Sequence, residues 1–188
     1  MATNLIEFPL KGRTRPGPCD PDLAEAARLG DRSAFTELIR RHQGTVRGMM
    51  RRLAGGNQAD ADDLAQSAFL TAWRRMETFR GGTFKSWICT IAYREFLQMA
   101  RRRKPETSET VEERGSEDSA ISGVRFDTDK AIASLPEQQR TAIILSLGAG
   151  MSHSEIAATT GWPIGTVKSH INRGKSALRE KLAVYGAA

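Results

Sequence analysis

Two apolar patterns separated by a tight turn, over residues 152–182, constrain the fold of this chain more than any other feature. Ser152 is followed three residues later by Glu155, the spacing of a capping box in which each side chain bonds a free backbone N–H at a helix start. Gly161 supplies the sharp reversal that follows, and Pro163 suits the first turn of a second helix. The sequence therefore predicts a helix-turn-helix.

The second helix of this motif has two different faces. Its apolar residues recur at spacings of four, seven and four, which places them on one stripe: Val167, Ile171, Leu178 and Leu182. The opposite face is polar and basic, and its first turns carry Lys168, Ser169, Asn172 and Arg173. Such a mixture suits base edges in the major groove of DNA and the phosphates beside them. An ordinary solvated helix face is the alternative.

The composition excludes several classes of protein. With 188 residues and 39% hydrophobic content, the chain can form one domain or two small ones. No apolar run approaches the roughly 20 residues of a membrane span, and residues 1–10 lack the pattern of a secretion signal, so we expect no membrane insertion.

Cys19, Cys89 and three histidines lack metal-ligand spacing, so we expect reduced thiols and no structural zinc. Cys89 lies in an apolar helical pattern that is typical of a small core residue.

Charge is distributed unevenly along the chain. The formal net charge is +6, yet residues 105–129 hold eight acidic and two basic residues and so carry −6. The rest of the chain then carries +12. Two basic blocks on either side of an acidic connector indicate two parts that bind nucleic acid. A solvated spacer is the alternative interpretation of the connector.

Helical periodicity divides the chain into two parts. Residues 1–21 are rich in proline and glycine and predict a disordered tail. Residues 22–104 predict several helices, and Pro105 ends the last of them. Residues 105–128 predict a flexible acidic linker, and 129–184 a second helical part in which Ile143, Ile144 and Leu147 build a small core. The expected fold is all-α, with two small helical domains joined by the linker.

Two segments together resemble one family. Residues 60–73, Asp-Ala-Asp-Asp-Leu-Ala-Gln-Ser-Ala-Phe-Leu-Thr-Ala-Trp, resemble the region 2 core helix of bacterial sigma factors. Residues 135–140, Leu-Pro-Glu-Gln-Gln-Arg, and 165–169, Gly-Thr-Val-Lys-Ser, resemble their region 4. The absence of an intervening region 3 is similar to the extracytoplasmic function (ECF) subgroup. The resemblance covers about residues 22–184, with region 2 over 22–104 and region 4 over 129–184.

The resemblance implies a dissociable initiation subunit that directs core RNA polymerase to a promoter and is not an enzyme. It implies no cofactor and no obligate homo-oligomer. It also suggests control by an anti-sigma factor in a stress or envelope response, and a cytoplasmic location with nucleoid association in the holoenzyme. The acidic linker would then pass through the polymerase cleft.

The resemblance also assigns roles to residues. The clamp helices of the largest polymerase subunit would bind Asp62, Asp63, Gln66 and Arg74, and the helix over 136–147 would meet the flap tip of the second-largest. The −35 element would be read by Lys168, Ser169, Asn172 and Arg173. The −10 element would be captured and opened by Arg80, Gly81, Gly82, Thr83, Arg94, Gln98, Arg101, Arg102 and Arg103.

Two positions depart from the family pattern. Arg94 stands where relatives usually have asparagine, so it would contact backbone phosphates instead of reading a base. His170 stands where a basic residue is common. Trp87 could stack on a base, although its spacing also fits the core.

Three other classes of function compete with this interpretation. A stand-alone helix-turn-helix regulator would use the first part to dimerise or to sense a ligand, but such sensors seldom carry the basic helix end that this chain has at residues 101–104. A sigma-like decoy that binds only an anti-sigma factor should lose its basic faces, and this chain keeps both. An enzyme is the most distant of the three, since no nucleophile elbow or phosphate-binding loop is evident in the sequence.

Overall fold

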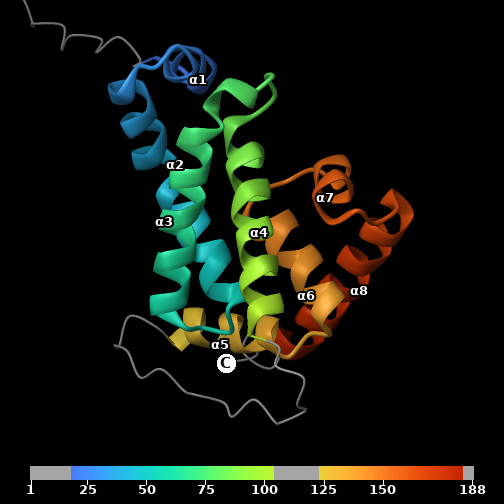
Figure 1. The fold of residues 1–188 in the computed structure, drawn as a ribbon. Coiled ribbons are helices and arrows are strands. Elements are labelled where there is room, and N and C mark those ends of the chain that lie inside the picture. The colour runs from blue at the N-terminus through green and yellow to red at the C-terminus, as the bar shows by residue number, and fades with distance from the viewer. Residues whose placement is uncertain (1–17, 104–122, 184–188) are drawn as a thin grey trace, which may run out of the picture.

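A computed structural model describes residues 18–103 and 123–183, with side chains described from residue 128 in the second range. Every regular element in these ranges is helical, which confirms the predicted all-α fold (Figure 1). The elements are α1 (Asp20–Arg28), α2 (Arg32–Leu53), α3 (Gln58–Arg74), η1 (Met76–Thr78), α4 (Phe84–Arg102), α5 (Gly123–Ala133), α6 (Glu137–Ile143), η2 (Ile144–Gly148), α7 (His153–Thr160) and α8 (Ile164–Ala183).

Helices α1 to α4 form the first half. The side chains of Asp31, Asn57 and Thr83 cap α2, α3 and α4 by accepting backbone N–H groups of the first turn. Five aromatic rings pack together at one end of this bundle, with ring centroids 5.0 to 6.3 Å apart: Phe35, Trp73, Phe79, Phe84 and Trp87. This aromatic cluster supports both ends of the loop over residues 80–83.

Helices α5 to α8 form the second half and contain the predicted helix-turn-helix. The Ser152 and Glu155 capping box is present, and Gly161 ends α7 at φ 76°, a left-handed conformation that favours glycine. Val167, Ile171 and Leu178 of α8 are buried, and Leu182 packs against the core while half-buried. The predicted apolar stripe of α8 is confirmed.

The two halves pack on one another and share a continuous core. Helix α2 contacts α5 and η2, and α4 contacts α7. In Figure 1, α4 lies in the middle, with α3 on one side and α6 to α8 on the other. The sequence predicted two small helical domains, and the two halves match this division. No periodicity within either half signals that they pack on one another. Most of the expected linker over residues 105–128, namely residues 105–122, lies outside the described residues.

Three expectations need correction. Helix α1 begins at Asp20, inside the expected tail, and α5 begins at Gly123, inside the expected linker. Leu147 is 58% exposed and does not join Ile143 and Ile144 in the core. The reason is the wider turn of η2, a π-helix in which the Ala149 N–H donates to the Ile144 carbonyl at 2.9 Å, so Ala149 takes the buried position instead.

Candidate nucleic-acid and partner surfaces

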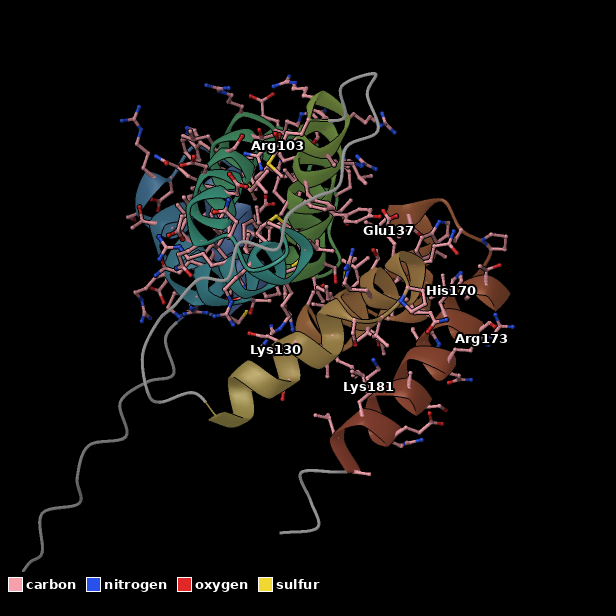
Figure 2. The ribbon with its side chains drawn as sticks, turned by 90° about the horizontal axis from the view of Figure 1, so that it is seen from below. Arg103, Lys130, Glu137, His170, Arg173 and Lys181 are labelled. Carbon is pink, nitrogen blue, oxygen red and sulfur yellow. The ribbon has the colours of Figure 1, made fainter. Side chains whose placement is uncertain are left out.

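Helix α8 presents its predicted −35 residues on the side opposite its buried stripe. Lys168, Asn172 and Arg173 are exposed, and Ser169 is half-buried. Figure 2 shows the Arg173 side chain directed away from α6. A basic and amide-bearing face on an otherwise packed helix is the arrangement that groove reading requires.

His170 has a different environment from these neighbours. Its ring packs against Trp162 of the turn, with centroids 5.3 Å apart, and its Nδ1 atom is buried without a hydrogen-bond partner among the described residues. The side chain is half-buried. His170 therefore supports the turn, which gives a structural reason for the departure noted in the sequence.

The loop over residues 80–83 borders a cavity of about 710 Å³. Gly81 and Gly82 adopt φ of 94° and 81°, so this sharp loop needs glycine at both positions. Arg80 is fastened locally, because its guanidinium donates to the Glu77 carbonyl. The residues that line the cavity come from α1, η1, the residue after η1 and the loop: Pro21, Glu25, Arg28, Glu77, Phe79, Arg80, Gly81 and Gly82. The exposed backbone of the two glycines suits an unpaired base, whereas Arg28 in the lining is already paired with Glu25 at 2.6 Å.

Helix α4 continues from this loop with exposed polar side chains. Arg94, Gln98, Arg101 and Arg102 are all exposed. Because they follow one another at helical spacings, they form a track along which phosphates can bind. Trp87 is half-buried between Phe79 and Phe84, which favours a role in the core over base stacking.

Arg103, another of the predicted −10 residues, forms an ion pair with an acidic residue of a different helix. Its guanidinium makes two hydrogen bonds to Asp60, and the Nη2 to Oδ1 distance is 2.7 Å. The hydrogen bonds from Arg103 lower the pKa of Asp60 despite some burial. Arg103 thus joins the end of α4 to the start of α3.

The predicted polymerase-binding residues lie on α3. Asp63, Gln66 and Arg74 are exposed, whereas Asp62 pairs with Arg47 of α2 at 3.2 Å. The sequence reasoning missed Leu70, which is 52% exposed in the middle of this face. Its spacing from Gln66 and Arg74, four residues in each direction, was the signal that could have found it. We call Asp63, Gln66, Leu70 and Arg74 the α3 face.

The region expected to meet the flap tip uses its apolar residues internally. Ile143 and Ile144 are buried, so they are part of the core of the second half. Leu147 remains the exposed apolar side chain of this region. Within residues 18–103 and 123–183, no helix is long and apolar enough to cross a membrane, and no group of three or more metal-ligating side chains gathers.

Comparison with protein families matches both halves separately. The Sigma-70 region 2 family matches residues 38–106, and the Sigma-70, region 4 family matches residues 125–178. The first match contains the α3 face, the loop over 80–83 and α4. The second contains the helix-turn-helix.

Curated relatives match across most of the chain. It is 32% identical to the ECF RNA polymerase sigma-E factor of Haemophilus influenzae, over 87% of this chain and 95% of the relative. It is 33% identical to the ECF RNA polymerase sigma-E factor of Escherichia coli K12, over 87% of this chain and 94% of that one. At 36% identity, ECF RNA polymerase sigma factor SigE of Mycolicibacterium smegmatis is longer, and the match spans 84% of this chain and 66% of the relative.

Solved structures agree with this result. The sigma factor RpoE of Bartonella quintana, solved in complex with the anti-sigma factor NepR, superposes with a TM-score of 0.64 at 29% identity over 80% of this chain and 97% of that chain. CnrH, solved with the cytosolic domain of CnrY, shares the fold with a TM-score of 0.67 at 24% identity over 88% of this chain and 97% of that one. Together the two family matches and the relatives show that the chain belongs to the sigma-70 family, among its ECF RNA polymerase sigma factors.

Proposed function

We propose that this ECF sigma factor binds core RNA polymerase through the α3 face and reads its promoter with two separate surfaces. The exposed side of α8 reads the −35 element in the major groove. The loop over residues 80–83 captures an unpaired base of the −10 element, and the track of Arg94, Gln98, Arg101 and Arg102 follows the strand.

One observation carries this proposal: both basic surfaces are exposed while the apolar sides of the same helices are buried. A decoy that binds only an anti-sigma factor has no need of either basic surface. A stand-alone regulator has no need of the α3 face, where Leu70 adds an apolar contact to three polar ones. Each surface is small, so tight promoter binding requires both at once in the holoenzyme.

Regulation by an anti-sigma factor is part of the proposal. The Bartonella quintana relative, at 29% identity, was solved with such a partner. We propose a partner of this kind for the present chain, which would work in the cytoplasm and reach the nucleoid as part of the holoenzyme.

Run-off transcription tests the proposal. Purified bacterial core enzyme is mixed with a pool of genomic promoter fragments, and transcripts are sequenced with and without the chain. Promoter-specific transcripts that require the chain are expected, and their alignment reports both elements. If the chain bound operator DNA without polymerase but never directed core enzyme to a promoter, it would instead be a stand-alone regulator.

A substitution on the α3 face tests the polymerase surface. Leu70→Glu places a charge in an apolar contact, so co-elution with core enzyme should fall at least tenfold. Ala158→Glu is the matched control, because Ala158 is exposed on α7, outside the proposed surfaces. Equal loss in both variants would argue against the α3 face.

A further inference from the structure

An apolar side chain is exposed at the tip of α8. Ile164 is the first residue of this helix and is 48% exposed, and its neighbours Pro163 and Gly165 are exposed too. The other large apolar side chains of α8 are buried or half-buried against the core: Val167, Ile171, Leu178 and Leu182. Packing in the core therefore explains those four residues, whereas much of the Ile164 side chain is available to a ligand.

Ile164 lies in one row of α8 with two of the predicted −35 residues. Lys168 and Asn172 follow it at successive intervals of four residues, and both are exposed. Residues 164–179 carry four basic side chains and no acidic one: Lys168, Arg173, Lys175 and Arg179. Because DNA is a polyanion, the charge along this stretch favours DNA as the ligand that Ile164 meets.

The tip of α8 is held firmly in place. The Trp162 ring, just before the helix, packs on His170 with centroids 5.3 Å apart. The Val167 N–H donates to the Pro163 carbonyl at 3.1 Å and closes the first turn. Isoleucine is β-branched, so the χ1 angle of Ile164 is restricted as well. An apolar contact made by Ile164 therefore costs little conformational entropy.

We propose that Ile164 is a specificity-determining residue that recognises the C5-methyl group of a thymine in the −35 element. In the major groove only thymine presents a methyl group, and apolar side chains are its natural contacts. The N-terminal residues of a recognition helix are the ones that reach base edges. Ile164 precedes Asn172 by eight residues, about 12 Å along the helix at about 1.5 Å per residue, so the two side chains read different base pairs. This role rests on the proposed function, because it belongs to the same −35 surface.

Uracil substitution tests this role directly, because deoxyuridine pairs as thymidine does and lacks only the C5-methyl group. Promoter fragments identified by run-off transcription are made with one uracil at a time in place of each thymine of the −35 element, on either strand. At one thymine, uracil should weaken binding of the wild-type holoenzyme about threefold or more. Ile164→Ala should weaken binding to the unmodified promoter by a similar factor, and the same uracil should then change binding by less than about 1.5-fold.

Two further variants separate a methyl contact from a general loss of affinity. Asn172→Ala removes a polar side chain from the same row, so its holoenzyme should bind more weakly and keep the full response to uracil. Ile164→Val retains a β-branched apolar side chain and should keep at least half of that response. Because Ile164 is exposed, Ile164→Ala should melt at the wild-type temperature when followed by circular dichroism.

The outcomes distinguish this role from the proposed function. If transcription requires the chain but uracil weakens binding of Ile164→Ala and the wild type by the same factor at every thymine, the methyl contact is refuted and the proposed function stands. A loss of affinity in Ile164→Ala would then indicate a protein partner at the tip of α8. Promoters that align without an A·T pair in the −35 element would refute the contact as well. If the wild-type chain directs no promoter-specific transcription, the proposed function fails, and the role of Ile164 fails with it.

Discussion

At the scale of single residues, Gly174 decides how closely α8 packs on α6. It is buried in the middle of α8, and a Cβ there would lie 2.6 Å from Cγ1 of Ile143, itself buried. We expect Gly174→Ala to destabilise the chain by about 1–3 kcal/mol through overpacking, even though alanine favours helices. Urea denaturation followed by circular dichroism measures this.

Gly165 is the matched control for Gly174. It lies in the first turn of the same helix, and a Cβ there would meet nothing within 4 Å. Gly165→Ala should be neutral or stabilising by up to about 1 kcal/mol. Equal effects of the two substitutions would contradict the close approach of α8 and α6.

The two cysteines differ in reactivity because of where each residue lies. Cys89 is fully buried in α4, and burial raises the pKa of its thiol to about 12. Its reactive thiolate is therefore scarce at pH 8, and populated only as the pH approaches 12. Iodoacetamide at about pH 8 should label the exposed Cys19 and leave Cys89 unmodified until urea unfolds the chain. Mass spectrometry of the labelled peptides distinguishes them, and rapid labelling of Cys89 in the folded chain would refute this.

At the scale of elements, we propose that α8 reads bases with its first turns and binds phosphates with residues farther along the helix. Asn172→Ala should weaken binding to the preferred −35 sequence by about 1–3 kcal/mol and relax specificity at one base pair. Arg179, exposed farther along α8, should contact phosphate. Arg179→Ala should therefore weaken binding to all promoters by the same factor. It should also reduce by about one the slope of the logarithm of the binding constant against the logarithm of the salt concentration. Binding of the holoenzyme to a panel of −35 sequence variants at several salt concentrations checks both predictions. If the two substitutions changed sequence preference and salt dependence in the same way, base reading and phosphate binding would not be divided along α8.

The same scale shows what helical pattern can and cannot predict. The capping box of Ser152 and Glu155 and the stripe through Val167 and Ile171 follow from local spacing, and the structure contains both. Leu147 shows the limit, because a single π turn rotates it out of the core and no residue type signals that turn.

At the scale of the whole molecule, one core runs through both halves and should make unfolding cooperative. Leu145 is fully buried in η2, the element that packs on α2. Leu145→Ala should lower the free energy of unfolding by about 2–5 kcal/mol. Calorimetry should show one transition at a lower temperature, and hydrogen exchange should speed up in α2 as well as in α8.

Leu147 provides the control within the same element. It is exposed, so Leu147→Ala should change stability by no more than about 0.5 kcal/mol. Two resolved transitions, or faster exchange confined to the second half in Leu145→Ala, would indicate that the halves fold independently.

The sequence by itself determined the helices, the helix-turn-helix, the family and the two basic surfaces, because caps, apolar stripes and charge are local properties of the chain. Only the tertiary structure decided that Arg103 pairs with Asp60, that Leu70 is exposed, and that Thr90 meets Thr159. These pairings join residues 43 and 69 positions apart. Contacts at such separations depend on how whole helices pack, which no short stretch of sequence encodes.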